Sequence, residues 1–155
     1  MPLDVPFRLG PFEVDEAGRL QAHSPDRLPV FQVAWRERTI HVCLDGGPDD
    51  GRLALHAILG RIPSSAASDA AGRTEAFTLL RTLAGAVPAG WSVQLLADHR
   101  IDLRAERHLA MPATVTDLVA EVALFLLALA PYLDLIADDS APALEPAGME
   151  KTCPG

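Results

Sequence analysis

The sequence predicts an α+β protein with two layers, in which an antiparallel sheet carries helices on one face and a long helix ends the domain. Several segments alternate apolar with polar residues, which is typical of strands that have one wet face. Other segments repeat apolar residues at helical spacing, and 115–137 is apolar almost all the way round. The 155 residues suit one domain of ordinary size. We expect an irregular lead-in over 1–11, a single domain over 12–137 and a disordered tail over 138–155.

Six segments have strand patterns, and turn residues separate them into three hairpins. They are 12–14 with 20–22, 31–35 with 40–44, and 93–97 with 101–109. The apolar members of the last four should face the helices, and they include Phe31, Val33, Trp35, Ile40, Val42, Leu44, Ile101, Leu103 and Leu109. His41 and Cys43 then project to the opposite, polar face, because successive side chains of a strand point to opposite sides.

Three helices are predicted. The first covers 52–60, where Asp49 or Asp50 precedes an apolar run as a helix cap. A second covers 73–86, which has apolar residues at helical spacing. The third is the long helix, and Thr114 can cap it together with Asp117 three residues later.

The long helix has apolar residues on the side that should face solvent. Its outer side holds Leu124, Leu127, Ala128 and Leu135. The uncharged run from Val122 to Leu133 is 12 residues, shorter than the roughly 18 to 20 residues that span a bilayer. We therefore expect a second helix or a second copy of the chain to cover this side, and we predict a homodimer whose interface includes it.

Charge and composition restrict the class of partner. The chain has 13 basic and 21 acidic residues and a formal net charge of −8, which disfavours nucleic acid and anionic lipid. The first residues lack the basic and apolar regions of a secretory signal, so we expect a cytoplasmic protein. Its two cysteines, Cys43 and Cys153, are too few for a disulfide framework and should be reduced.

The second half resembles a known layout. The charged hairpin from Trp91 to Arg104, then Pro112 and a Leu-rich helix that ends in Ala130-Pro131-Tyr132-Leu133-Asp134, resembles the C-terminal half of bacterial type III secretion chaperones and the related YbjN-like proteins. This resemblance covers about residues 12–137 and implies a small acidic dimer that holds a segment of another protein. Those chaperones usually open with a helix, and one helix in the middle is common where this sequence predicts two.

Candidate sites lie mainly on the polar sheet face. His41 and Cys43 have the spacing of two metal ligands, but structural zinc needs four and the others are absent. The outward row of the last predicted strand consists of Asp102, Arg104, Glu106 and His108. These groups could serve acid–base chemistry or could simply keep the sheet soluble. We expect no metal and no cofactor, and an alternative site at His41, Cys43, Arg104 and His108.

Three hypotheses of function follow from these observations. The first is a non-enzymatic protein-binding module, a small acidic homodimer that holds a segment of a partner protein. The second is a small-molecule-binding or enzymatic domain with a site on the charged sheet face. The third is a structural subunit of a larger assembly. A deep pocket around the histidines would favour the second hypothesis over the other two.

Overall fold

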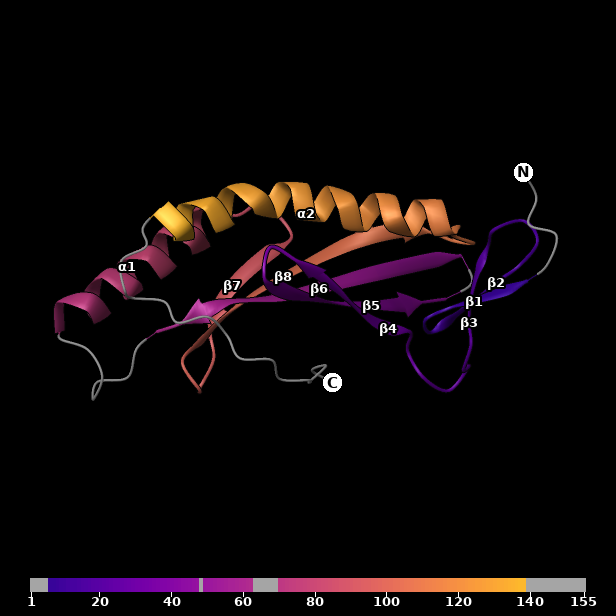
Figure 1. Cartoon of the computed structure of the whole chain (residues 1–155), viewed down its shortest axis with the longest axis horizontal. Coiled ribbons are helices and arrows are strands. Elements are labelled where there is room, and N and C mark those ends of the chain that lie inside the picture. Colours follow the sequence, from indigo (N-terminus) through magenta and orange to yellow (C-terminus); the bar gives the residue numbers. More distant parts are fainter. Residues whose placement is uncertain (1–5, 48, 63–69, 139–155) are drawn as a thin grey trace.

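The computed structural model describes residues 6–47, 49–62 and 70–138, and it shows the predicted α+β class with two antiparallel sheets and two helices (Figure 1). The strands are β1 (Phe7–Leu9), β2 (Phe12–Val14), β3 (Leu20–Ala22), β4 (Val30–Trp35), β5 (Arg38–Gly46), β6 (Asp50–Arg61), β7 (Trp91–Leu95) and β8 (Arg100–Ala110). The helices are α1 (Ala70–Ala86) and α2 (Val115–Asp138). The predicted tail lies outside the described residues, apart from Asp138 at the end of α2.

The larger sheet has five strands in the order β4-β5-β6-β8-β7, and every neighbouring pair is antiparallel. β4 and β7 are therefore its edges. α2 lies along one face of this sheet, while α1 is at the end near β7 (Figure 1). Tyr132 on α2 donates its hydroxyl hydrogen to the carbonyl of Ala86 at the end of α1, at 3.0 Å. The helices thus contact each other at one end, and the opposite face of the sheet carries neither of them.

A smaller sheet of β1, β2 and β3 is attached to the beginning of α2. The amide of Leu20 donates to the carbonyl of Ala113 at 2.8 Å, and the amide of Val115 donates to Gly18 at 3.1 Å. The predicted lead-in over 1–11 must be corrected, because β1 occupies Phe7–Leu9 within it. The three prolines of the lead-in suggested irregular backbone, yet the residues between Pro6 and Pro11 pair with β2.

The predicted helix over 52–60 is wrong, because the segment is part of the twelve-residue strand β6. Leu53, Leu55, Ala57 and Leu59 are buried on one face, which is the period of a strand. Ala54 and Ile58 on the other face obscured this alternation, since they gave the segment apolar residues at helical spacings too. β6 is the central strand of the sheet, and pairing on both sides overrides its local helical preference.

Both remaining predicted helices are present, and the long one begins where its capping residues predicted. Thr114 Oγ1 accepts the amide hydrogen of Asp117 at 3.2 Å, and the Thr114 amide donates to the Asp117 carboxylate at 2.8 Å. These reciprocal bonds satisfy donors that the first turn leaves free. The amide and the hydroxyl of Thr114 both donate to the Asp117 carboxylate, and these two bonds lower the pKa of Asp117.

The core lies between the larger sheet and α2, and the predicted strand register is confirmed. All nine apolar strand residues expected to face the helices belong to this core or pack against it. From α2 the core receives Leu118, Val122, Phe125, Leu129, Leu133 and Ile136. His41 alternates with the buried Ile40 and Val42, so its side chain lies on the opposite face, as predicted.

Candidate functional site

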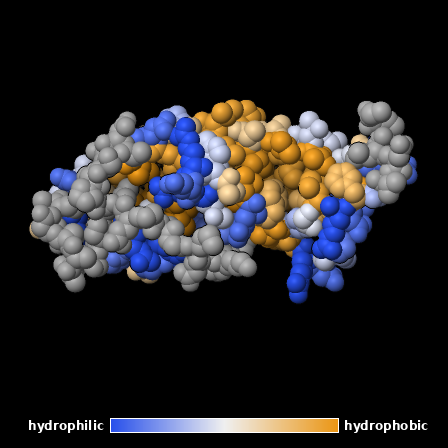
Figure 2. All heavy atoms as spheres, in the orientation of Figure 1, coloured by the Kyte–Doolittle hydropathy of each residue, from blue (hydrophilic) through white to orange (hydrophobic). Residues whose placement is uncertain are grey.

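The outer side of α2 is uncovered by any described part of the chain. Leu127 is 68% exposed, Leu124 51% and Leu135 40%, and Ala128 is exposed as well. Figure 2 shows hydrophobic residues gathered over the middle of the molecule, where α2 crosses the sheet. Soluble monomers rarely leave a contiguous apolar surface of this kind. The sequence left open two covers for this side, a second helix and a second copy of the chain. Within the described residues no helix lies over it, and α1 is joined to α2 by the hydrogen bond from Tyr132 to Ala86.

By length and composition, Val115–Ile136 could also cross a membrane, and a core helix of a soluble protein passes the same test. In the structure, one side of this helix packs into the core through Leu118, Phe125 and Leu129. The helix therefore has one side in the core and one apolar side exposed.

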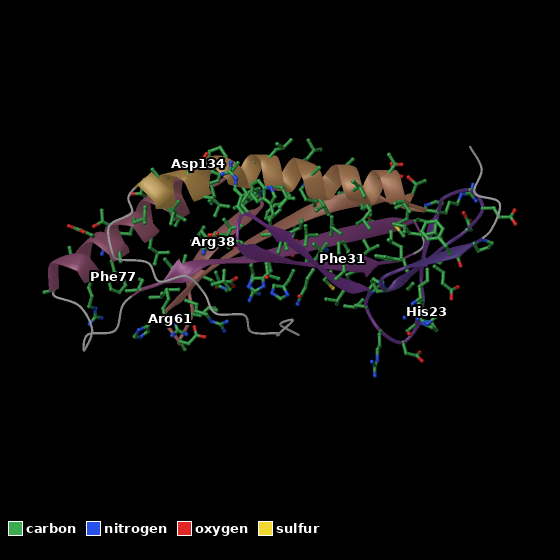
Figure 3. The ribbon with its side chains drawn as sticks, viewed as in Figure 1. His23, Phe31, Arg38, Arg61, Phe77 and Asp134 are labelled. Atoms are coloured by element: carbon green, nitrogen blue, oxygen red, sulfur yellow. The ribbon has the colours of Figure 1, made fainter. Side chains whose placement is uncertain are left out.

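An apolar groove of about 410 Å³ runs beside α2, between the helix and β4. Phe31 and Val33 of β4 form one wall, and Val119, Val122 and Leu126 of α2 are among the residues of the other. The hairpin of β1 and β2 closes one end with residues 9–12. Phe31 lies under α2 in this region (Figure 3). No polar surface lines the groove, so water inside it gains little from hydrogen bonds and an apolar side chain would displace it readily.

β4 is an edge strand without a charged residue. Its sequence is Val-Phe-Gln-Val-Ala-Trp, and β5 is its only neighbour in the described sheet. A two-residue turn joins the two strands, with φ of 48° at Arg36 and 60° at Glu37, the backbone of a tight hairpin. Arg36 then forms an ion pair with Asp134 of α2 at 2.6 Å. Edge strands usually carry charges or are covered, so an uncharged edge beside an apolar groove is open to pairing.

The helix-free face of the sheet carries a row of polar side chains across four strands. Gln32, His41, His56 and Arg104 are opposite one another in β4, β5, β6 and β8. The rings of His41 and His56 are 5.5 Å apart, and Gln32 Nε2 is 3.3 Å from His41 Nδ1. Burial, and secondly the neighbouring His56, lowers the pKa of His41. Both effects favour the neutral form of His41.

Asp102 is the centre of this polar cluster, and its side chain is fully buried. Arg104 Nε donates to Asp102 Oδ2 at 2.7 Å, Gln94 Nε2 donates to the same oxygen at 3.0 Å, and His56 Nε2 contacts Oδ1. Burial by itself would raise the pKa of Asp102, but bonds from His56, Gln94 and Arg104 lower it to about 2. The carboxylate is thus ionised and partnered, as a buried charge must be.

The structure brings together three of the four residues of the predicted alternative site. His41, Cys43 and Arg104 line a hollow of about 220 Å³, while His108 lies outside it and pairs with Asp50 at 2.6 Å in an exposed position. Sequence reasoning missed His56 and Asp102. The helix predicted over 52–60 removed His56 from the sheet. Asp102 belonged to the predicted outward row, but no signal distinguished it from its exposed neighbours.

His56, which lines this hollow, and its partner Asp102 are poorly placed for acid–base catalysis. The two ring nitrogens of His56 and Asp102 Oδ1 contact almost no solvent, and Nδ1 has no hydrogen-bond partner among the described residues. A general base must reach the proton that it abstracts, and in this structure the ring nitrogens of His56 are closed to solvent. Among residues 6–47, 49–62 and 70–138, no three His, Cys, Asp or Glu side chains are placed to hold a metal ion.

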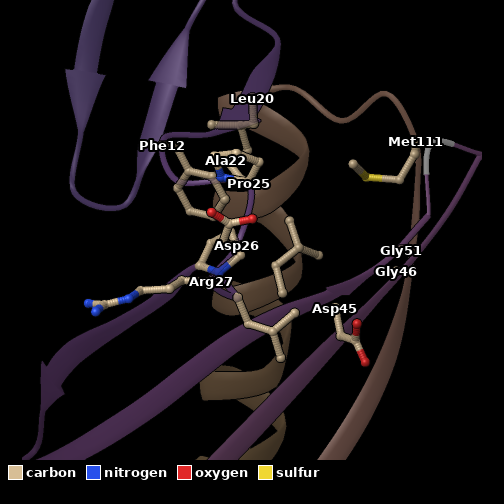
Figure 4. Close-up of a pocket in the computed structure, with 13 residues that line it drawn as sticks. Phe12, Leu20, Ala22, Pro25, Asp26, Arg27, Asp45, Gly46, Gly51 and Met111 are labelled. Atoms are coloured by element: carbon tan, nitrogen blue, oxygen red, sulfur yellow. The ribbon is translucent and has the colours of Figure 1, made fainter.

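Another hollow, of about 270 Å³, lies where the smaller sheet meets the end of the larger one (Figure 4). Phe12, Leu20 and Met111 supply apolar walls, and the loop of 25–29 covers one side. Gly51 is necessary here, because a Cβ at this position would be 2.9 Å from the Leu109 carbonyl oxygen and 3.0 Å from the Met111 side chain. The charged groups that line this hollow are of both signs, Asp26 and Asp45 with Arg27, and they indicate no single class of ligand.

No protein-family model, curated protein sequence or solved structure that was compared with the chain matches it. The geometry of the described residues is therefore what supports a proposal of function.

Proposed function

We propose that the protein is a non-enzymatic protein-binding module, a homodimer that holds a segment of a partner protein. The observation that carries this proposal is the uncovered apolar surface of α2, where Leu124, Leu127 and Leu135 are exposed. Ala128 completes the surface that we assign to the dimer interface. Burial of apolar area drives most protein association, at roughly 25 cal/mol per Å² removed from water.

The layout of the chain supports the same proposal. One helix, α1, lies between β6 and β7, and a long helix follows the last strand pair. The secretion chaperones commonly have one helix in the middle of the chain. The single helix α1 at this place is therefore closer to their layout than the two helices that the sequence predicted. The first described elements are strands, whereas those proteins usually begin with a helix.

The proposed dimer interface is tested by Leu124→Asp. Wild-type protein should behave as a dimer at tens of micromolar in light scattering coupled to size exclusion. The variant should be monomeric or aggregated, because a carboxylate buried at a packed interface without a partner costs several kcal/mol.

Thr116→Asp is the matched control, because Thr116 is exposed on the same helix but outside the proposed interface. It should remain dimeric. Circular dichroism should show that both variants are folded, because Leu124 is half exposed within one chain and its replacement leaves no core cavity. A wild-type monomer at high concentration would contradict the proposed dimer.

The second candidate function is binding of a small molecule on the charged sheet face. The hollow beside His41, Cys43 and Arg104 favours it. Two features make this candidate the weaker one. The volume of the hollow, about 220 Å³, is smaller than that of the apolar groove, and its lining has both negative groups, Asp45 and Glu106, and positive groups, Arg52 and Arg104. Native mass spectrometry with elemental analysis separates the two candidates, because a retained metal or small molecule would favour this one.

A further inference from the structure

We infer that the segment held by the module binds as an added β-strand along β4, with alternate apolar side chains inserted into the groove beside α2. This inference rests on the proposed function and specifies its partner, which is an extended segment of about five to seven residues. Two features define the site together. One is the apolar groove, with walls from α2 and the β1–β2 hairpin, and the other is the outer edge of β4, which pairs with no other strand of the described residues. Strand addition is a general mode of peptide recognition in which backbone bonds give affinity and alternate side chains give specificity.

The backbone of β4 has hydrogen-bonding groups directed away from the sheet. The amide of Leu44 donates to the carbonyl of Pro29 at 3.0 Å. Hydrogen-bonded pairs alternate along an antiparallel ladder, so Phe31, Val33 and Trp35 also bond to β5. The residues between them, Val30, Gln32 and Ala34, therefore direct their amides and carbonyls outward.

The two faces beside this edge differ in chemistry. Phe31 and Val33 direct their side chains toward α2 and line the groove, which has no polar surface. On the other face, Gln32 of β4 is opposite His41 of β5. An added strand has the same alternation as its neighbour. Its inward positions should therefore be apolar, and its outward positions polar.

The ends of the site limit the length of the segment. β4 has six residues, and the β1–β2 hairpin closes one end of the groove. At the other end of β4, the Arg36–Asp134 ion pair joins the hairpin turn to α2. A segment of about six residues fits between these limits at roughly 3.4 Å per residue. The net charge of −8 disfavours an acidic segment.

Gln32→Pro tests the backbone pairing. Proline removes the outward amide hydrogen of residue 32, and it leaves the ladder with β5 intact because that amide points away from β5. Gln32→Thr is the matched control, because it also loses the contact between Gln32 and His41 but retains the amide and favours a strand.

The probes are two labelled peptides of identical composition. One has the sequence Lys-Thr-Val-Thr-Val-Thr-Val-Lys, and the other groups the three threonines and then the three valines between the lysines. Fluorescence anisotropy should show that the alternating peptide binds wild type and Gln32→Thr at least tenfold more tightly than Gln32→Pro. The grouped peptide should bind all three proteins weakly, because it cannot direct every valine to one face.

Ala123→Glu tests the groove, since Ala123 lines it and a carboxylate there meets no polar partner. Binding of the alternating peptide should be lost in this variant and retained in Thr116→Glu, a substitution outside the groove. If Ala123→Glu abolishes binding and Gln32→Pro leaves it unchanged, the groove accepts side chains without strand pairing and the inference is overturned. Lack of preference for the alternating peptide would overturn it as well.

Light scattering on the same samples keeps the inference separate from the proposed function. The Gln32→Pro variant should remain a dimer, because β4 is outside the interface assigned to α2. If the wild type is a dimer and the Gln32→Pro variant is a monomer, a second copy of the chain occupies β4 and the inferred partner segment is wrong. If the peptide binds as expected to a wild-type monomer, strand addition stands and the proposed dimer fails.

Discussion

At the scale of single residues, Asp102 shows how a buried charge is accommodated on a sheet face. Its carboxylate has no exposed surface, yet three side chains from β6, β7 and β8 compensate for the lost water. Such a group stabilises the fold only while its partners remain, because removal of one partner leaves a buried charge or donor unsatisfied. His56, Gln94 and Arg104 therefore act as one unit with Asp102.

Asp102→Asn should lower the free energy of unfolding at pH 7 by about 2 kcal/mol. This is the stabilisation that corresponds to the lowering of the Asp102 pKa from 3.8 to about 2 on folding. Because the folded pKa lies below the unfolded one, this stability is present above about pH 4 and is lost as pH falls toward 2. Urea titrations from pH 7 to pH 2 should show a smaller loss of stability in acid for the variant. Glu106→Gln, an exposed change on the same strand and face, should alter stability by less than about 0.5 kcal/mol.

At the scale of elements, the first turn of α2 is determined by its own residues. Thr114 and Asp117 bond reciprocally, and the beginning of the helix also bonds to Gly18 in the turn between β2 and β3. The cap therefore begins the helix, and the bond to Gly18 attaches this end of α2 to the smaller sheet, whose β1–β2 hairpin closes one end of the groove.

Thr114→Ala should destabilise the protein by about 1 kcal/mol, because the amide of Asp117 loses its acceptor. Thermal unfolding followed by circular dichroism provides the measurement. Thr116→Ala, two residues later and exposed, should be neutral or slightly stabilising, because alanine has the higher helix propensity. Equal losses in the two variants would show that the cap contributes nothing beyond helix propensity.

At the scale of the whole molecule, the two faces of the sheet have different roles in the fold and in the proposed function. The face under α2 supplies the core, and the groove and the outer side of α2 continue its apolar character to the surface. The opposite face is polar and holds its charges in pairs, such as Asp102 with Arg104. Association should therefore occur on the α2 side.

The thermal midpoint of the wild type should rise with protein concentration, because association stabilises the folded state by mass action. Scanning fluorimetry between about 1 and 100 µM should show this rise. The midpoint of Leu124→Asp should not depend on concentration if the variant is monomeric. A wild-type midpoint that is equally constant would argue against the dimer.

The sequence by itself determined what short-range patterns encode. Period-two alternation predicted the register that buries Ile40 and Val42 and turns His41 to the other face, and the Thr114–Asp117 spacing predicted where α2 begins. It also showed that α2 has apolar residues on its outer side. These features depend on side chains a few residues apart in the chain.

Only the tertiary structure decided what depends on neighbours that are distant in sequence. β6 is a strand because β5 and β8 pair with it on both sides, although its sequence also has helical spacing. This pairing brings His56 to Asp102, and the edge position of β4 and the packing of α2 form the groove. Burial of Asp102 and exposure of Glu106, two outward residues of one strand, are likewise set by the side chains from adjacent strands that surround each of them.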